Sequence, residues 1–433
     1  MSSLGTARLS ALVIGNTIGA GIYFLPVSLA PFGGISLIGW LVTSLGSILL
    51  ALVFARLARN NSKAGGPYAY TKAAFGSFWG FQSAWGYWAA TWMSNAALAV
   101  AAVSYMSVFW PMLATNRLAS CMAGLFLIWI ATLINAVGVK KTSSVQVIIT
   151  ILKITPLILV GVVGLFWITP SHFEPINLSN MSDISAINAV ATLTLWAFIG
   201  LESGTVPSQH VKNPTKTIPR ATILGTILCA VIYMTVTVSV LGLIPADKLA
   251  KSSAPLADAA KILFGDWTAN LVAAGAVLSA FGCLIGWVLL QAQMPYAAAI
   301  DGSFPKMFAK LSKRQVPIVG LVLSSLLMTL VMCMNFVSSL AEQFTALVNL
   351  STFIILVPYA LSTLADFRNE RARGFKALII SALAFGYSSW LIIGAGSQSI
   401  LLGMGFLLLG VPVYFYMKRK NKVCAASSKL VAE

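Results

Sequence analysis

The chain has 433 residues, of which 58% are hydrophobic and 9% carry a charge, and its mean hydropathy is +0.88. Soluble domains contain about 25% charged residues, so this composition excludes a water-soluble globular protein. The net charge of +17 arises from basic residues in short connections between apolar segments, and these do not form the aromatic-rich basic patch of a nucleic-acid-binding protein. We therefore expect a membrane protein with a lipid bilayer around it and no nucleic-acid partner.

Residues suited to catalysis or metal binding are scarce. The two histidines, His172 and His210, lie in predicted loops about 40 residues apart, which leaves little material for a zinc or nucleophile site. The cysteines are widely separated and offer neither a disulfide framework nor a CxxC motif; they are Cys121, Cys229, Cys283, Cys333 and Cys424. We expect no enzyme activity, no metal and no cofactor.

Hydropathy over windows of about 19 residues predicts twelve membrane-spanning helices. Each is long enough to cross a hydrocarbon core of about 30 Å, and helices satisfy the backbone there. The predicted spans are 9–30, 35–55, 75–109, 118–138, 143–168, 187–206, 221–244, 268–298, 316–337, 343–365, 376–396 and 398–417. No connection is long enough for a separate soluble domain. The sequence thus predicts one all-α membrane domain over 1–433 and a short tail, 418–433.

The distribution of basic residues predicts the orientation of these spans. With the amino terminus in the cytoplasm, the inner connections hold 23 of the 28 lysines and arginines and the outer connections hold 4. The remaining one, Lys153, falls inside a span. By the positive-inside rule, both termini face the cytoplasm.

Two predicted spans contain glycines that disfavour a continuous helix. In the first, Asn16 and Thr17 precede Ile18, Gly19, Ala20 and Gly21, and in the sixth Gly200 stands between Ile199 and Leu201. Each glycine costs a helix interior about 1 kcal/mol relative to alanine. The alternative interpretation is that these small residues merely permit close helix packing.

Interrupted helices at matching places in two halves indicate the midplane site of a secondary transporter with inverted repeats. We assign the repeats to 9–168 and 187–365, with two further helices at 376–417. Each break exposes backbone N–H groups and a positive dipole end, which suit a substrate carboxylate.

Two ionisable residues lie deep in the predicted membrane region, Glu202 in span 6 and Lys153 in span 5. Each costs on the order of 3 kcal/mol by insertion scales and is a functional candidate. We expect Glu202 to couple protons to transport. Two structural alternatives stay open: Glu202 could brace the second half of span 6, and Lys153 could donate to carbonyls freed by a broken helix.

Aromatic residues near the breaks are further candidates. Trp196 stands six residues before Glu202, where its ring could cover a bound side chain and attract a cation. Other polar or aromatic candidates are Tyr87, Trp88, Trp92 and Asn95 in span 3 and Trp287 in span 8. Composition alone does not decide which of them point inward.

These motifs resemble the amino acid/polyamine/organocation superfamily over nearly the whole chain. The resemblance is carried by Gly19-Ala20-Gly21, by Gly65-Gly66-Pro67-Tyr68-Ala69-Tyr70, by Phe198-Ile199-Gly200-Leu201-Glu202, and by Lys212-Asn213-Pro214 with Ile218-Pro219-Arg220. It is strongest to bacterial basic amino acid and polyamine antiporters. It implies a LeuT-type fold of five plus five helices in inverted repeats with discontinuous helices 1 and 6, in the bacterial inner membrane, and a possible homodimer.

The resemblance also implies roles for individual residues. The substrate carboxylate would bind the backbone of Gly19 to Gly21, Trp196 would stack on the substrate's cationic tail, and Glu202 would sense protons. The other implied residues are Tyr87 and Trp287 in the gates, Tyr68 in the cytoplasmic closure, and Asn95 and Ser351 in polar contact with substrate. Asn16 and Ile199 complete the predicted substrate site.

Three departures from the arginine exchanger of that branch weaken the transfer: Ala20 replaces a serine, Leu98 replaces a methionine, and Lys153 has no counterpart. A lysine in span 5 is similar to that of proton-coupled amino acid transporters in the same superfamily. The sequence therefore predicts an exchanger of basic amino acids or their amines, with proton-coupled symport of neutral amino acids as the alternative. A channel or a receptor is disfavoured because neither a ring of pore residues nor an output domain is found.

Overall fold

The computed structural model of the protein describes residues 5–60, 66–138, 143–202, 211, 213–334, 339–368 and 374–430. Within these residues the regular elements are helices and no β-strand occurs, which confirms the expected all-α class. The first elements are α1 (Thr6–Thr17), α2 (Gly21–Leu29), η1 (Ala30–Phe32), α3 (Ile35–Asn60), α4 (Pro67–Phe75), α5 (Ser77–Met106), α6 (Met112–Thr115), α7 (Arg117–Val137), α8 (Ser143–Gly164), η2 (Leu165–Trp167) and η3 (Pro170–Phe173). They are followed by α9 (Asp183–Leu195), η4 (Trp196–Phe198), α10 (Pro214–Leu243), α11 (Ala246–Leu249), α12 (Pro255–Phe264), α13 (Asp266–Ile300), η7 (Lys306–Ala309), α14 (Ile318–Met334), α15 (Leu340–Arg368), α16 (Phe375–Gly394) and α17 (Ser397–Leu430).

In the part of the chain that the structure describes, helices lie in each segment that hydropathy predicts as a span. Among the described residues, seven helices are long and apolar enough to cross a membrane, namely α3, α7, α10, α13, α15, α16 and α17. Shorter apolar helices occur at Gly21–Phe32, Lys153–Trp167, Asp183–Phe198 and Ile318–Met334. The chain is thus a multi-pass membrane protein.

The long helix α5 lies at the centre of the bundle and is less apolar than its neighbours. It packs against α13 and α15, and nearly all of its side chains from Gly80 to Tyr105 are buried. Small and polar residues suit this position, because a helix enclosed by other helices needs close packing and does not need a lipid-facing surface. Burial within protein therefore explains why α5 falls outside the group of strongly apolar helices.

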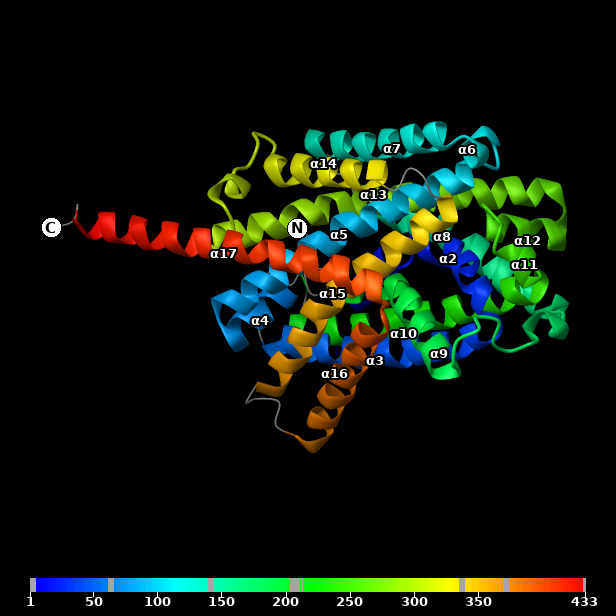
Figure 1. The fold of residues 1–433 in the computed structure, drawn as a ribbon, viewed down its shortest axis with the longest axis horizontal. Coiled ribbons are helices and arrows are strands. Elements are labelled where there is room, and N and C mark those ends of the chain that lie inside the picture. Colours follow the sequence, from blue (N-terminus) through cyan, green and yellow to red (C-terminus); the bar gives the residue numbers. More distant parts are fainter. Residues whose placement is uncertain are drawn as a thin grey trace.

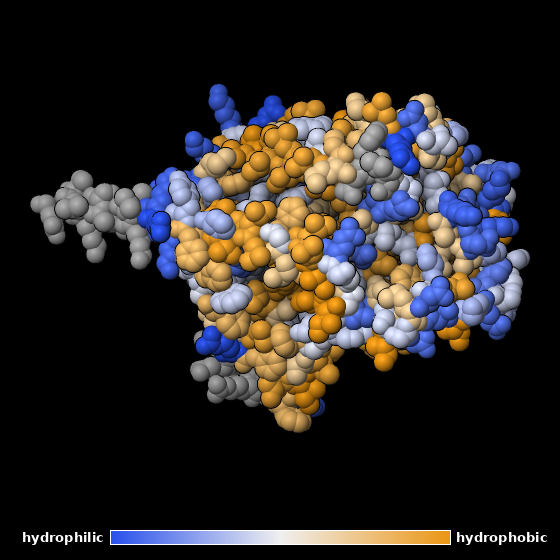
Figure 2. Space-filling view, in the orientation of Figure 1, coloured by the Kyte–Doolittle hydropathy of each residue, from blue (hydrophilic) through white to orange (hydrophobic). Residues whose placement is uncertain are grey.

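Polar and apolar surfaces separate along the bundle. In Figure 1 the helices α6, α11 and α12 gather at one end, while α4 and the end of α17 lie toward the other. Figure 2 shows apolar residues over the middle of the visible face and many polar residues toward the ends. This is the arrangement expected of a protein whose middle lies in hydrocarbon.

Several elements in the connections were not predicted from hydropathy. The short helices α4, α6, α11 and α12 lie between predicted spans, and α12 packs on α13, α2 and α8. α12 carries Asp258 and Lys261, so its sequence does not read as a continuous apolar run. The last helix, predicted over 398–417, continues to Leu430 and includes most of the expected tail.

Candidate functional site

The first predicted span is interrupted where its glycines indicated. α1 ends at Thr17, Ile18 is extended with φ −76° and ψ 94°, and α2 begins at Gly21. The first N–H groups of a helix have no partner within that helix. The start of α2 therefore presents backbone donors and a positive dipole end at the break.

A second interruption follows α9. The 3-10 turn η4 succeeds this helix, Ile199 is extended, and Gly200 adopts a φ of 110°. A side chain at that φ would be strained, so the conformation requires glycine. The continuation of this span at 203–210 lies outside the described residues.

A tyrosine on α10 connects the two interruptions. The Tyr233 hydroxyl lies 2.9 Å from the carbonyl oxygen of Thr17 and 3.0 Å from that of Ala197, and the side chain is fully buried. It can donate to either oxygen, each of which belongs to a helix end that leaves carbonyls unpaired. Tyr233 thus holds the two breaks side by side. Sequence reasoning missed it, since the available signal was a lone tyrosine within an apolar span.

Lys153 lies at the carboxyl end of α1. Its ammonium donates to the carbonyl oxygen of Gly15 at 3.1 Å and to that of Ile18 at 3.4 Å, and only 2% of the residue is exposed. The hydroxyl of Tyr23 donates to the main-chain oxygen of Lys153. A cation is stabilised at a helix carboxyl end, where the dipole is negative. Lys153 therefore has the geometry of the structural alternative, a donor to carbonyls freed by the break.

A pocket lies between the two interruptions, with a cavity volume of about 30 Å³. This space suits about two water molecules, so an amino acid needs the pocket to widen. The lining residues come from α1, the α1–α2 break, α2, α5, η4, the position after η4, and α13; they are Thr17, Gly19, Gly21, Thr91, Ser94, Asn95, Leu98, Trp196, Ala197, Ile199, Cys283 and Trp287.

The two glycines of the first break make room for this pocket. A Cβ atom at Gly21 would lie 2.9 Å from Cζ3 of Trp196, and one at Gly19 would lie 2.9 Å from Sγ of Cys283. Real Cβ atoms essentially never approach a neighbour so closely. At Gly21 a methyl group would displace the Trp196 ring, whereas at Gly19 the Cys283 side chain would have to rotate away.

Polar groups in the pocket are partly satisfied by one another. The Trp196 indole donates to Oγ of Ser94 at 3.1 Å, and the Asn95 amide donates to Oε1 of Gln291 at 2.7 Å. Oδ1 of Asn95 and Oγ1 of Thr17 are buried and have no hydrogen-bond partner within the described part of the chain. A buried acceptor without a partner is costly, so these two oxygens can receive hydrogen bonds from a bound ammonium group.

The carboxylate of Glu202 is enclosed beside the pocket and does not line it. Oε1 accepts a hydrogen bond from the Tyr87 hydroxyl at 2.6 Å, and Oε2 accepts from the Tyr359 hydroxyl at 2.8 Å. The backbone N–H of Gly200 donates to Oε2 at 3.1 Å. These bonds join α5, α15 and the second break, and Tyr359 is a partner that sequence reasoning did not find.

Two further aromatic rings form a cluster with Trp196. The Trp196 ring packs edge to face on Phe344 of α15 at 5.3 Å between centroids. Phe344 packs in the same manner on Phe24 of α2 at 4.8 Å. Such pairs are worth about 0.5–1.5 kcal/mol beyond the area they bury. If α2 moves away from α15, the contact between Phe24 and Phe344 is therefore lost.

A polar cluster lies at the end of the bundle where α4 meets α13. Oδ2 of Asp301 accepts a hydrogen bond from the Tyr68 hydroxyl at 2.6 Å and one from the Lys72 ammonium at 2.5 Å. Oγ of Ser303 lies 2.9 Å from the hydroxyl oxygen of Tyr68. Burial lowers the pKa of Lys72, but its bonds to Asp301 and Tyr68 outweigh this and raise the pKa above its usual 10.5. Lys72 therefore stays charged through the physiological pH range.

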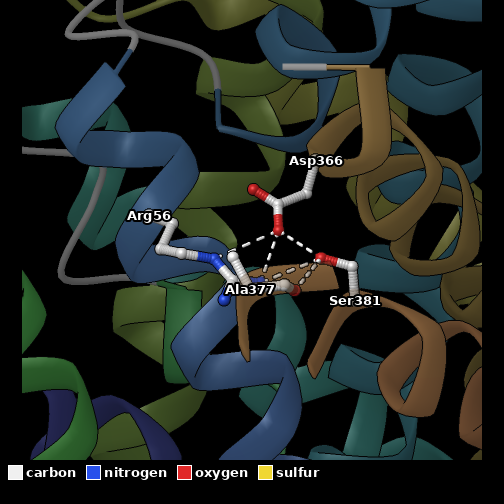
Figure 3. A network of polar contacts seen from close by, with 4 residues as sticks. All are labelled: Arg56, Asp366, Ala377 and Ser381. Atoms are coloured by element: carbon white, nitrogen blue, oxygen red, sulfur yellow. Dashed lines mark hydrogen bonds and ion pairs between the residues drawn. The ribbon is translucent and has the colours of Figure 1, made fainter. Parts of the chain in front are cut away.

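A second polar network joins α3, α15 and α16 (Figure 3). Oδ2 of Asp366 accepts from Nη2 of Arg56 at 2.5 Å and from the Ser381 hydroxyl at 2.6 Å. The same Ser381 hydroxyl lies 3.0 Å from the Ala377 carbonyl oxygen, which is an alternative acceptor for its one proton. Asp366 is 3% exposed, so the ion pair is largely removed from water. Replacing either Arg56 or Asp366 by a neutral residue would leave the other charge buried without its partner.

The structure does not gather every predicted residue around the pocket. Ser351 is fully buried, its hydroxyl donates to the Val348 carbonyl, and it does not line the cavity. Ala20 is also absent from the lining. The side chain of Asn16 lies outside the described residues. The roles assigned to these three residues stay predictions.

Within the described residues, no group of three or more His, Cys, Asp or Glu side chains is arranged to hold a metal ion. A bundle of apolar helices with a pocket between two helix breaks defines the class of membrane transport proteins. An amino acid permease family model matches residues 4–421. The chain belongs to the amino acid permease family and is a transporter, not an enzyme.

Similarity to known transporter sequences covers nearly the whole chain. The chain is 34% identical over 430 residues to the cadaverine/lysine antiporter of Escherichia coli, covering 97% of this chain and 95% of the relative. It is 32% identical to a putrescine transporter of Haemophilus influenzae, covering 97% and 98%. It is 31% identical to a putative arginine/ornithine antiporter of Bacillus subtilis, covering 95% and 96%.

Proposed function

We propose that this protein exchanges a basic amino acid for an amine of the decarboxylated type by alternating access around the pocket between the two helix breaks. The observation that carries the proposal is the position of Trp196, whose ring packs against Gly21 at the start of α2. The N–H groups there suit a carboxylate, and the ring face suits a cationic group. One pocket thus offers contacts for both ends of a basic amino acid.

The relatives support the same substrate class. Their names specify cadaverine and lysine, putrescine, or arginine and ornithine. An amine without a carboxylate would keep the contact with Trp196 and the acceptors of Asn95 and Thr17, and would lose the contact with α2. Exchange of two substrates that share a cationic tail is consistent with this division of the pocket.

The proposed architecture has twelve spans, with α1 and α2 forming the first and α9 and η4 opening the sixth. Repeats over 9–168 and 187–365 then each begin with an interrupted helix, and 376–417 adds two helices. The basic connections favour cytoplasmic termini in a bacterial inner membrane. On this topology Tyr68, Lys72 and Asp301 form a cytoplasmic closure, and Phe24, Phe344 and Trp196 cover the pocket on the outer side. A homodimer stays a prediction.

Glu202 is proposed to couple protons to the exchange through its bonds with Tyr87 and Tyr359. Protonation of the carboxyl group would remove one acceptor position and weaken the connection between α5 and α15. Symport of neutral amino acids, which Lys153 suggested, is less favoured. The two named antiporters among the relatives point to exchange, and the bonds from Lys153 to Gly15 and Ile18 give it a structural role.

Counterflow in proteoliposomes tests the proposed function. Vesicles loaded with lysine, ornithine or arginine should take up labelled cadaverine, putrescine or agmatine at least about tenfold faster than empty vesicles. Trp196→Ala should reduce this uptake about 30-fold, since a desolvated cation–π contact is worth about 2 kcal/mol. The matched control is Trp79→Ala on the exposed face of α5, where 46% of the residue is accessible.

Net uptake of a small neutral amino acid into empty vesicles, driven by a pH gradient, would contradict the proposal. So would equal rates for Trp196→Ala and Trp79→Ala with basic substrates.

A further inference from the structure

The helices α7 and α14 form a closely packed antiparallel seam at one edge of the molecule (Figure 1). The Trp129 indole donates to Oγ1 of Thr329 at 3.2 Å. Further along, a Cβ atom on Gly124 would lie 2.3 Å from Cε of Met332, so glycine permits the close approach of the two helices. Small residues commonly allow such approach between membrane helices.

This seam ends at two cysteines. Cys121 lies three residues before Gly124 on α7, and Cys333 directly follows Met332 on α14, so the close approach of Gly124 and Met332 brings the two cysteines near each other. Cys333 is exposed and precedes the last residue of α14, and Cys121 is partly exposed and lies in the second turn of α7. At 1.5 Å per residue, Cys121 is about 6 Å from the start of its helix. Both thiols therefore lie near the same end of the bundle and within reach of its boundary.

The other described cysteines are unlike this pair. Cys229 and Cys283 are buried inside the bundle. Thiols in apolar interiors behave as small hydrophobic groups, whereas accessible thiols in contact can be oxidised. The pair at the seam is thus distinguished by its proximity across two packed helices and by its exposure.

We propose that Cys121 and Cys333 form a reversible disulfide that links α7 to α14 at the outer face of the membrane. The inference rests on the orientation given in the proposed function, which places the start of α7 and the end of α14 outside. An oxidising compartment permits disulfides there, whereas cytosolic thiols are kept reduced. The oxidant is a protein dithiol oxidase in its disulfide form.

The reaction is a double thiol–disulfide exchange. The more accessible Cys333 loses its proton and attacks a sulfur of the oxidase disulfide, which gives a mixed disulfide and releases one oxidase thiolate. Cys121 then loses its proton and attacks Sγ of Cys333, which expels the second oxidase thiolate. Two protons leave this protein and two electrons reduce the oxidase disulfide to a dithiol.

Neither α7 nor α14 contributes a residue to the pocket lining. Both pack against α5 and α13, and the link would fasten two helices that are already neighbours. A covalent link between them raises stability by restricting the unfolded chain. We expect the oxidised protein to keep its transport rate within about twofold and to unfold at a higher temperature than the reduced protein.

Counting reactive thiols tests the pair directly. Cells are quenched with acid, and the denatured protein is labelled with a maleimide polymer before or after reduction. The chain has five cysteines, so the disulfide form accepts three labels and the reduced form accepts five. Cys121→Ala and Cys333→Ala should each accept four labels under both conditions. The control Cys229→Ala should accept two labels before reduction and four after it.

A second experiment adds the oxidant copper–phenanthroline to the purified protein. It distinguishes cysteines that cannot form a disulfide from cysteines that lie on the cytoplasmic side of the membrane. Five labels in cells and also after this oxidant would overturn the inference. A link that forms only in purified protein, with Cys333 unreactive to a membrane-impermeant maleimide on intact cells, would place the pair in the cytoplasm and also overturn it. That second result would overturn the proposed orientation as well, whereas counterflow tests the pocket independently of both.

Discussion

The two helix interruptions are opened by the same kind of residue and stabilised by opposite charges. At the first, glycines permit the break and the Lys153 ammonium donates to carbonyls at the end of α1. At the second, Gly200 turns the chain and its N–H donates to the Glu202 carboxylate. A helix end leaves carbonyls without partners, and a break also leaves N–H groups without partners. The positively charged Lys153 therefore lies beside exposed carbonyls at the first break, and the acidic Glu202 lies beside an exposed N–H group at the second.

The two breaks differ in which of their exposed groups have a side-chain partner. Lys153 and Tyr233 satisfy carbonyls of α1, and Glu202 is enclosed by Tyr87 and Tyr359. The start of α2, by contrast, has no side-chain cap. Its first backbone N–H groups therefore lack a side-chain acceptor, and substitutions at the two breaks should have different effects.

The largest effect is expected when the first break is filled. Gly21→Ala places a methyl group 2.9 Å from the Trp196 ring. Overpacking costs about 1–3 kcal/mol, which corresponds to a loss of about 5-fold to 150-fold in counterflow. Gly286→Ala is the matched control, because a Cβ at Gly286 meets nothing within 4 Å and the residue adjoins Trp287. Equal counterflow rates in the two variants would contradict the close packing of α2 against Trp196.

The next effect concerns the charge that stabilises the first break. Lys153→Ala removes the donor to the carbonyls of Gly15 and Ile18, and buried acceptors left unsatisfied cost about 1–3 kcal/mol. We expect a lower unfolding temperature and about tenfold slower exchange, with partial recovery in Lys153→Arg. Lys261→Ala, exposed on α12, is the control. A fully stable Lys153→Ala protein that has lost only its response to a pH gradient would instead assign Lys153 to proton coupling.

A smaller effect is expected from the residue that connects the breaks. Tyr233→Phe removes one hydroxyl and keeps the ring that packs on Trp40 and Phe198. The lost bond is worth about 1 kcal/mol, so exchange should slow about fivefold in steady-state uptake. Tyr416→Phe, at an exposed position of α17, should have no effect. An unchanged rate in Tyr233→Phe would show that the two breaks do not need this connection.

The smallest change in maximal rate is expected at the second break, where the pH profile is the informative measurement. Glu202→Gln removes a proton-binding group and should flatten the pH dependence of exchange between pH 5 and 8. Lys72→Ala should change the rate equally at every pH in this range. The pKa of Lys72 is raised above 10.5, so the stabilisation from its charged form is complete below that value and lost only as the pH rises beyond it. A pH profile in Glu202→Gln that matches the unmodified protein would exclude Glu202 from proton coupling.

Sequence reasoning located much of the site because the membrane restricts what a chain can contain. A charge in hydrocarbon is costly, so Glu202 and Lys153 stood out, and glycines in an apolar span indicated the breaks. Trp196, Asn95 and Trp287 were also found, and the structure places all three around the pocket. Tyr359 and Tyr233 were not found, because a tyrosine in an apolar span is common and its partner lies on another helix.

The sequence by itself determined the class of protein, the helical segments and the two places where helices break, since these depend on local hydropathy and on backbone freedom at glycine. Tertiary structure decided which groups meet: Lys153 with the end of α1, and Glu202 with two tyrosines. Such pairings join residues far apart in the chain, and helix packing alone fixes which faces of two helices come together.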